Sequence, residues 1–432
     1  MTRQLERLTE ALLTAAKRAG ADAADAIAVD GVASSIDIRQ GALEQAERAE
    51  GVEMGLRVLV GQRQACVSVS DISDATIAAV AERAVAMARE APQDPWAGLA
   101  DPSQLAQDRD ATALQLCDSA PEVSAAALED DARRAEAAAM AVQGITQVEA
   151  SASQSRRRIH LAASNGFAGG YMRSSRSVSA VAFAGEGSGM ERDWAAEGRI
   201  FATDLPGADE IGTLAAERAL ARLGARKPRT GTFPVLYDER ISAGLIGHLL
   251  GAVNGSAITR GSSWLRDALG TQVLPIGLSV IEDPHRARVG GSRLFDSEGL
   301  ATTRRAIVEN GLLTGWVLDL ASARKLGLQS TANAARGTSA PPSPGTSNID
   351  LTPGTATRAD LIAQMGTGLL VTSLIGSSIN PTTGDYSRGA SGFWVENGEI
   401  THAVNECTIA GNLRDMLMRI IPANDARAHM ST

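Results

Sequence analysis

The sequence predicts an α+β protein in which an N-terminal α/β portion precedes a C-terminal domain with a large, mostly antiparallel sheet. Three observations lead to this class. Stretches with helical spacing and stretches with strand-like alternation both occur along the chain. The Asn165-Gly166 dipeptide separates two alternating runs, which is a strong signal of a β-hairpin. With 432 residues, the chain is too long for one ordinary core, so two or three domains are expected.

The first 90 residues predict a helix, a small sheet and a second helix. Leu5, Leu8 and Leu12 repeat at helical spacing, and Gly20 stands where a C-cap would follow. The helical period returns over residues 74–90, with Ser73 as its N-cap. Between the two helices, alternating runs predict antiparallel strands over residues 26–29, 35–39, 55–60 and 65–69.

A proline-containing connection over residues 91–107 leads to the middle of the chain. Two helices are expected there, one over 121–142 with Pro121 near its first turn and one over 209–223. Between them lie four predicted strands, at 148–153, 158–163, 175–183 and 192–201.

These elements place a domain boundary near residue 225. Residues 1–225 form an N-terminal α+β region, which the connection can divide into subdomains of about 1–100 and 120–225. Residues 226–432 form the sheet-rich C-terminal domain.

The C-terminal domain is expected to contain one prominent helix among many strands. Ile241, Leu245 and Leu249 share a face of the helix over residues 241–251, and neighbouring apolar residues suggest burial on most sides. The Gly/Ala/Ser/Thr/Pro-rich segment 330–348 predicts an irregular loop. Strands are predicted at 233–237, 272–281, 306–308, 315–318, 368–374, 386–395 and 399–404, with a closing helix over 411–420.

The sequence argues against nucleic-acid binding, membrane insertion and secretion. A net charge of −9 and only 3% aromatic residues argue against a nucleic-acid surface, which needs basic patches and stacking rings. No apolar run is long enough to cross a membrane, and the first residues lack the apolar core of a signal peptide. Cys66, Cys117 and Cys407 are an odd number of cysteines without zinc-site spacing. A cytoplasmic, reducing setting is therefore expected.

The helix over residues 241–251 carries a single histidine, His248. In many metallopeptidases, two histidines on adjoining turns bind zinc, and a glutamate beside the first acts as general base. The corresponding positions here are Ala243 and Gly244, which offer neither a ligand nor a base. We therefore expect no catalytic residue and no metal in this chain.

This stretch resembles the TldD/PmbA family of bacterial proteins. In that family the TldD branch carries His-Glu-x-x-x-His at this place and the PmbA (TldE) branch does not, so this chain resembles the metal-free branch. Further matching motifs extend the resemblance over nearly the whole chain; they are Ser164-Asn165-Gly166, Phe295-Asp296-Ser297-Glu298-Gly299, Val395-Glu396-Asn397-Gly398-Glu399-Ile400 and Thr408-Ile409-Ala410-Gly411-Asn412.

The resemblance implies a subunit that pairs with a TldD-type zinc protease around an internal chamber. The partner would supply the zinc, the base and the catalysis, and this chain would supply the other wall and hold an extended peptide substrate. Family members are linked to maturation of a gyrase-poisoning peptide antibiotic and to degradation of an antitoxin, which explains the label "modulator of DNA gyrase". The acidic, aromatic-poor composition does not support binding to DNA.

The turn that follows the helix supplies the candidates for peptide binding. Turn residues are usually only turns. In the resemblance, however, this stretch lies beside the active-site cleft, and Arg260 next to polar side chains could hold the carbonyls or carboxylate of a peptide. The candidates are Asn254, Ser256, Arg260, Gly261 and Ser262.

Two residues have a functional and a structural interpretation. In the functional interpretation, His248 is a relict metal ligand or still positions a peptide or a water. In the structural one, it is a buried histidine hydrogen-bonded to the backbone, which the missing partner on the helix favours. Cys407 precedes the segment after which the TldD branch places a ligand cysteine, so a small buried side chain is expected instead.

Two other classes of function stay open on the sequence alone. One is a metallopeptidase active on its own, with ligands scattered along the chain such as His160, His285, His402 or His429. The other is a peptide-binding homodimer that works without a protease.

Overall fold

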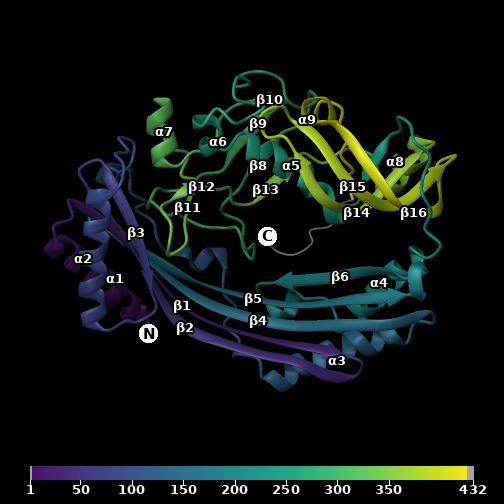
Figure 1. Ribbon diagram of the computed structural model, residues 1–432, viewed down its shortest axis with the longest axis horizontal. Helices are drawn as coiled ribbons and strands as arrows, with labels where there is room; N and C mark the ends of the chain where they lie inside the picture. Colours follow the sequence, from purple (N-terminus) through teal and green to yellow (C-terminus); the bar gives the residue numbers. More distant parts are fainter. Residues whose placement is uncertain (1, 426–432) are drawn as a thin grey trace.

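The computed structural model describes residues 2–425 and confirms the α+β class (Figure 1). Its largest sheet lies in the N-terminal part and has the strand order β3-β2-β1-β4-β5-β6, with every neighbouring pair antiparallel. Strands from the two predicted subdomains thus share one sheet. The strands are β1 (Ala23–Arg39), β2 (Ala42–Val60), β3 (Arg63–Val69), β4 (Ile145–Ala163), β5 (Ala168–Ala184) and β6 (Glu191–Arg199).

Two helix pairs cover the same face of this sheet. Helices α1 (Thr2–Ala19) and α2 (Asp74–Glu90) pack on the even-numbered residues near the start of β1. Helices α3 (Ala125–Met140) and α4 (Ala208–Ala221) pack on the even-numbered residues near its end. Ser73 caps α2 as predicted, whereas α3 begins only after Ser124, which accepts a hydrogen bond from the Ala127 amide. Pro121 therefore precedes the helix.

Several strands are longer than the sequence indicates. The runs predicted at 26–29 and 35–39 both belong to β1, and those at 148–153 and 158–163 both belong to β4. Polar side chains such as Gln154 and Arg156 interrupt the apolar alternation, but the backbone ladder with β1 continues through them. The pattern of buried residues marks only the parts of a strand that face a core.

The C-terminal part contains two four-stranded sheets and one two-stranded sheet within the described residues. The first has the order β16-β15-β14-β7, with only the short β7 parallel to its neighbour. Its strands are β7 (Val235–Tyr237), β14 (Gly368–Ile379), β15 (Asp385–Glu396) and β16 (Glu399–Asn412). The second has the order β10-β9-β8-β13, from β8 (Val280–Glu282), β9 (Arg305–Glu309), β10 (Leu312–Leu313) and β13 (Ile349–Leu351).

In the part of the chain that the structure describes, five helices accompany these sheets; they are α5 (Glu239–Ala252), α6 (Gly255–Thr259), α7 (Leu320–Leu326), α8 (Arg358–Met365) and α9 (Leu413–Leu417). The strand predicted over 272–281 is realised only from Val280, and the one predicted over 315–318 is wrong. There, Val317 makes a single bridge to Asn254 instead of joining a ladder.

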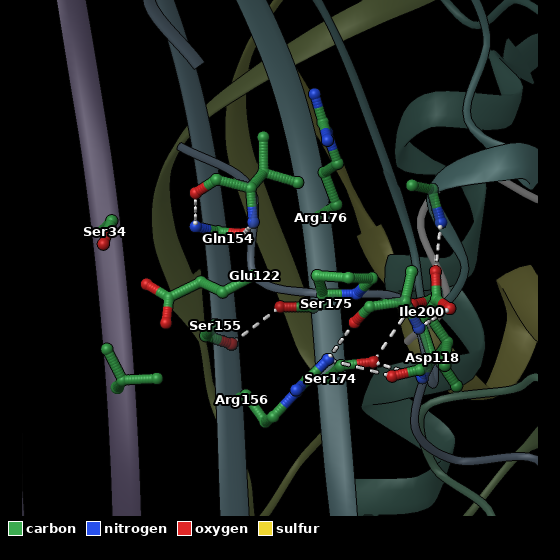
Figure 2. A pocket seen from close by; sticks show the side chains of 15 residues that line it. Ser34, Asp118, Glu122, Gln154, Ser155, Arg156, Ser174, Ser175, Arg176 and Ile200 are labelled. Carbon is green, nitrogen blue, oxygen red and sulfur yellow. Dashed lines mark hydrogen bonds between the residues drawn. The ribbon is translucent and has the colours of Figure 1, made fainter. Parts of the chain in front are cut away.

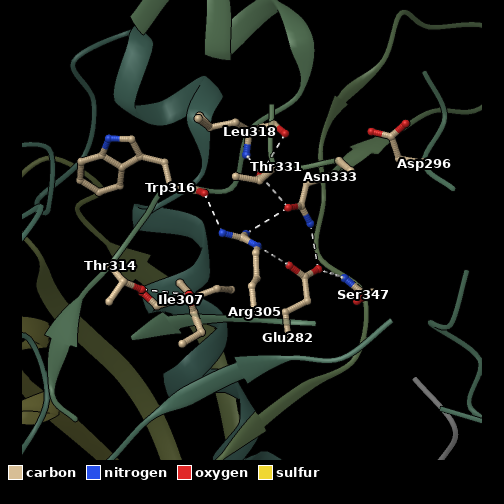
Figure 3. Close-up of polar contacts among 12 residues, drawn as sticks. Glu282, Asp296, Arg305, Ile307, Thr314, Trp316, Leu318, Thr331, Asn333 and Ser347 are labelled. Atoms are coloured by element: carbon tan, nitrogen blue, oxygen red, sulfur yellow. Dashed lines mark hydrogen bonds and ion pairs between the residues drawn. The ribbon is translucent and has the colours of Figure 1, made fainter. Parts of the chain in front are cut away.

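A buried polar network orders the segment 330–348, which was expected to be an irregular loop (Figure 3). Arg305 Nε donates to Glu282 Oε2 at 3.0 Å and Arg305 Nη2 donates to Asn333 Oδ1 at 3.0 Å. The side-chain Nδ2 of Asn333 donates in turn to Glu282 Oε1 at 2.8 Å. The segment also contains the paired strands β11 (Ala334–Ala335) and β12 (Ser343–Pro344). The polar residues of this segment therefore form specific hydrogen bonds that fix its conformation.

Two ionic junctions connect the C-terminal part to the six-stranded sheet. At the first, Asp25 of β1 lies between Arg57 of β2 and Arg336, whose side chain is fully buried. Arg57 Nε donates to Asp25 Oδ2 at 2.7 Å, and Arg336 pairs with Oδ1. Burial would raise the pKa of Asp25, but the two guanidinium groups outweigh it and hold that pKa below its usual value.

The second junction lies at the opposite end of the sheet. Arg240 Nη1 is 2.9 Å from Asp193 Oδ1 of β6, and Arg222 donates to Ser391 Oγ of β15 at 2.9 Å. Between the two junctions, the C-terminal strands and helices lie opposite the sheet face that α3 and α4 leave open (Figure 1).

Beside the first junction, two acidic side chains are buried together. Asp296 accepts hydrogen bonds from the amides of Glu298, Leu300 and Ala334 at 2.9–3.0 Å. Glu298 Oε2 accepts from the Leu320 amide at 2.8 Å and lines a cavity of about 10 Å³ with Asp25 and Arg57. Burial, followed by the neighbouring Asp296, raises the pKa of Glu298 to about 8.

None of the described helices is long and apolar enough to cross a membrane.

Candidate functional site

Helix α5 begins where β7 ends. Asp238 caps it by accepting a hydrogen bond from the Arg240 amide, and the Asp238 amide bonds to the Val371 carbonyl of β14. The cap therefore fixes the helix on the sheet β16-β15-β14-β7. Ile241 joins the apolar cluster over this sheet, and Leu249 is fully buried in the adjoining core.

The expectation that this helix is buried on most sides is wrong. Of its residues, only Leu249 and Ala252 are buried, and Ala243 and Gly244 are exposed. Apart from its chain neighbours and the backbone of its own helix, a Cβ built on Gly244, Gly247 or Gly251 meets nothing within 4 Å. The apolar residues cover one face of α5. The opposite face carries Gly244, Gly247 and Gly251 and therefore lacks side chains; we call it the bare face.

His248 lies at the edge of this bare face and is half-buried. Its ring packs edge-on to Tyr386, with 5.8 Å between the ring centroids. No residue in the described range hydrogen-bonds its imidazole, so the expected bond to the backbone is absent there. Burial, and then the nearby Arg388, lower the pKa of His248, which keeps the imidazole neutral at pH 7.

Three further polar side chains belong to the same cluster, because Tyr386 contacts His248, Tyr237 contacts Tyr386, and Arg388 lies within electrostatic reach of the histidine. The Tyr237 hydroxyl donates to the Tyr386 hydroxyl at 3.4 Å. Burial, together with this hydrogen bond, raises the pKa of Tyr237. Arg388 donates from Nε to the Gly376 carbonyl at 2.7 Å, where β14 has a bulge, and no carboxylate of the described chain pairs with it.

These surroundings do not fit a zinc ion. Catalytic zinc takes three protein ligands, usually His, Glu, Asp or Cys. His248 is instead accompanied by two tyrosine hydroxyls and by Arg388, whose fixed positive charge opposes a metal cation. Over residues 2–425, no three His, Cys, Asp or Glu side chains gather closely enough to hold a metal ion.

The other histidines named as scattered candidates occupy separate places. Each described one pairs with a threonine hydroxyl, as His160 with Thr9 at 2.9 Å, His285 with Thr302 at 3.1 Å and His402 with Thr401 at 2.9 Å. His429 lies outside the described residues. Cys407 is half-buried and its thiol donates to the Ala390 carbonyl at 3.1 Å.

The candidate turn residues build the ends of the short helix α6. Asn254 caps its start, accepting from the Ser256 amide at 2.9 Å, and donates to the Pro344 carbonyl at 2.9 Å. At its end, the Ser262 amide bonds to Ala257 and the Gly261 amide to Ile258, with Gly261 at a φ of +71°. These bonds form a Schellman motif, which requires a left-handed residue. Four of the five candidates thus have local structural roles.

Arg260 is the exception among these candidates. Its side chain is exposed, and no described residue forms a hydrogen bond or ion pair with it. It therefore stays a candidate for peptide binding.

Tyr237, Tyr386 and Arg388 were not among the residues predicted to form the site. The alternation of the predicted strand 386–395 places Tyr386 and Arg388 on one face. Nothing in the sequence indicates that α5 lies over that face, because the contact depends on tertiary packing.

A second cavity, of about 60 Å³, lies on the helix-covered face of the six-stranded sheet (Figure 2). Its polar groups bond to each other and to the backbone. Arg156 donates to the carbonyls of Asp118 and Ala120 at 3.0 and 2.7 Å, and Gln154 donates to the Val123 carbonyl at 2.6 Å. These bonds hold the segment before α3 against the sheet, so the polar groups around the cavity have a structural role.

Comparison with known proteins identifies the class of protein to which this fold belongs. Family models described as PmbA/TldA metallopeptidase domain 1, central domain and C-terminal domain match residues 24–88, 118–223 and 230–432. The chain belongs to the PmbA/TldD metallopeptidase family.

The individual relatives point to the PmbA branch. The chain is 38% identical to Metalloprotease PmbA of Escherichia coli O157:H7 over 421 residues, which cover 97% of this chain and 91% of that protein. A Bacteroides thetaiotaomicron structure described as a modulator of DNA gyrase superposes with a TM-score of 0.91 at 27% identity, covering 99% and 95% of the two chains. TldE from Thermococcus kodakarensis shares the fold, with a TM-score of 0.83 at 19% identity over 98% and 97%.

The other branch of the family is more distant. A Metalloprotease TldD homolog of Buchnera aphidicola is 25% identical over 48% of this chain and 44% of its own length.

Proposed function

We propose that this chain is the PmbA/TldE-type subunit of a TldD–TldE zinc metalloprotease and that it carries no catalytic metal. The observation that supports this is the set of groups around His248. The positions where a peptidase helix would carry a ligand and a base hold Ala243 and Gly244, and Arg388 places a positive charge near His248. A TldD-type partner would supply the zinc and the base.

The proposed substrate is an unfolded or extended peptide, as in peptide-antibiotic maturation and antitoxin degradation. This chain would hold the peptide while the partner cuts it. The bare face of α5 supports this role, because an extended backbone can approach glycine more closely than any other residue. Three cysteines without a disulfide suit a cytoplasmic location.

The test is cleavage of an unstructured peptide by this chain alone, by a TldD-type partner alone, and by the two mixed, each with and without a chelator. We expect chelator-sensitive cleavage only in the mixture. Chelator-sensitive cleavage by this chain alone would refute the proposal and favour a metal site built from distant residues. Binding of peptide without any effect of the partner would favour a peptide-binding homodimer.

A variant of the motif tests the same point from the other side. Ala243→His with Gly244→Glu restores a His-Glu-x-x-x-His sequence ending at His248. We expect no zinc-dependent cleavage by this double variant alone, because a third ligand is also missing. Zinc content after gel filtration, measured beside the unmodified chain, shows whether any site has formed.

A further inference from the structure

The glycines of α5 have no explanation within the described chain. Glycine in a helix interior is less stable than alanine, because it loses more backbone freedom on folding. Elsewhere, close packing demands it, as at Gly255, where a Cβ would lie 2.5 Å from Ser322 Oγ. Gly244, Gly247 and Gly251 have open space instead. We take the bare face as a surface to which another backbone comes close.

This surface has a fixed cation beside it. Tyr386, Arg388 and Ala390 alternate along β15 and so share one face. Ala390 packs in the cluster that contains Ile241 at the start of α5, and Tyr386 packs in the one that contains Leu249 near its end. Arg388 therefore lies along the middle of the helix, within electrostatic reach of His248.

The guanidinium of Arg388 is only partly used. Its Nε is bonded to the Gly376 carbonyl, which restrains the side chain. No described residue bonds its terminal nitrogens, and no described carboxylate neutralises it. A guanidinium with two free terminal NH2 groups matches a carboxylate in charge and geometry.

We infer that the bare face of α5, with His248 and Arg388, binds the C-terminal carboxylate of an extended peptide. Arg388 pairs with the carboxylate, the neutral His248 and the Tyr237 hydroxyl flank it, and the last residues of the peptide lie along Gly244, Gly247 and Gly251. This inference rests on the proposed function, since it names the end of the peptide that this subunit holds.

The test compares two fluorescent peptides that differ only at the C-terminus. One labelled hexapeptide has a free carboxylate and the other a C-terminal amide, and anisotropy gives each Kd for the full-length chain. We expect the free acid to bind at least about tenfold more tightly, as a charge-assisted hydrogen bond implies. Arg388→Gln should weaken the acid to the level of the amide, and Arg388→Lys should restore part of the preference. Equal binding of both peptides by the unmodified chain would overturn the inference.

Two further variants keep the result interpretable. Arg266→Gln changes an exposed arginine whose one ion pair among the described residues is with Asp267, so it should leave both affinities unchanged. Gly247→Leu adds a large side chain to the bare face at a position where its Cβ has open space, so it should fold and weaken both peptides. If Gly247→Leu instead spares peptide binding but prevents association with a TldD-type chain, the face is a subunit interface and the inference is wrong. Binding is measured without the partner, so failure of the mixed cleavage assay would refute the proposed function alone.

Discussion

At the scale of single residues, burial decides the behaviour of the charged groups. Asp25 and Glu298 line the same small cavity, but their pKa values shift in opposite directions. Asp25 is paired with two arginines, whereas Glu298 has Asp296 beside it and lies near Arg57 without pairing with it. Glu298 is therefore protonated at neutral pH.

The proton on Glu298 makes stability depend on pH. The folded chain holds the proton up to about pH 8, whereas an unfolded chain releases it near about pH 4.3. The free energy of unfolding therefore falls as pH rises between these values. The side chain of the Glu298→Gln variant cannot ionise. Between pH 5.5 and pH 8, its free energy of unfolding should therefore rise by at least about 1 kcal/mol relative to that of the unmodified chain.

Urea unfolding at both pH values measures this gain. Glu217→Gln, at an exposed acid on α4, serves as the control and should show no such change. A constant difference between Glu298→Gln and the unmodified chain would show that Glu298 is already ionised.

At the scale of elements, two helical glycines make a matched pair. Gly247 in α5 has open space around it, and Gly212 in α4 would place a Cβ 2.0 Å from the Ala135 carbonyl of α3. Gly247→Ala should raise the free energy of unfolding by up to about 1 kcal/mol through helix propensity alone.

Gly212→Ala should have the opposite effect. The added methyl group forces α4 away from α3, and overpacking of this kind costs about 1–3 kcal/mol. Urea unfolding of both variants under one condition tests the pair. A stabilising Gly212→Ala would mean that the two helices separate without loss.

The elements were largely predictable where local signals decide them. Helix α2 and its Ser73 cap, the Asn165-Gly166 turn, and the helix that carries His248 all follow from spacing and turn chemistry. The full length of β4 was missed because Gln154 and Arg156 break its apolar pattern. Arg388 was missed because α5, beside which it lies, is far away in the sequence, and no local pattern encodes that neighbourhood.

At the scale of the whole molecule, Asp25 forms one of the two ionic junctions between the C-terminal part and the sheet. It is the carboxylate between Arg57 and Arg336, both with side chains that are almost or fully buried. Asp25→Asn leaves two buried guanidinium groups without their counter-charge, so it should cost about 3–5 kcal/mol. Asp30→Asn removes a pair with Arg158 at 3.9 Å that is about a quarter exposed, and it should cost at most about 1 kcal/mol.

Loss of the Asp25 junction should also appear as local opening. Limited proteolysis should cut Asp25→Asn within residues 334–345 faster than it cuts Asp30→Asn. Equal cleavage of the two variants would mean that the polar network around Glu282 holds this segment alone.

The order of the six strands has a consequence for how the protein folds during synthesis. β1 is central in the sheet, but its partner β4 lies on the order of a hundred residues later in the chain. While those residues are being translated, β1, β2 and β3 can collapse onto α1 and α2, but the other edge of β1 has no partner. A chain that stops before residue 145 would keep this edge open and prone to pairing with other chains. Correct folding therefore depends on the arrival of β4 before a competing strand.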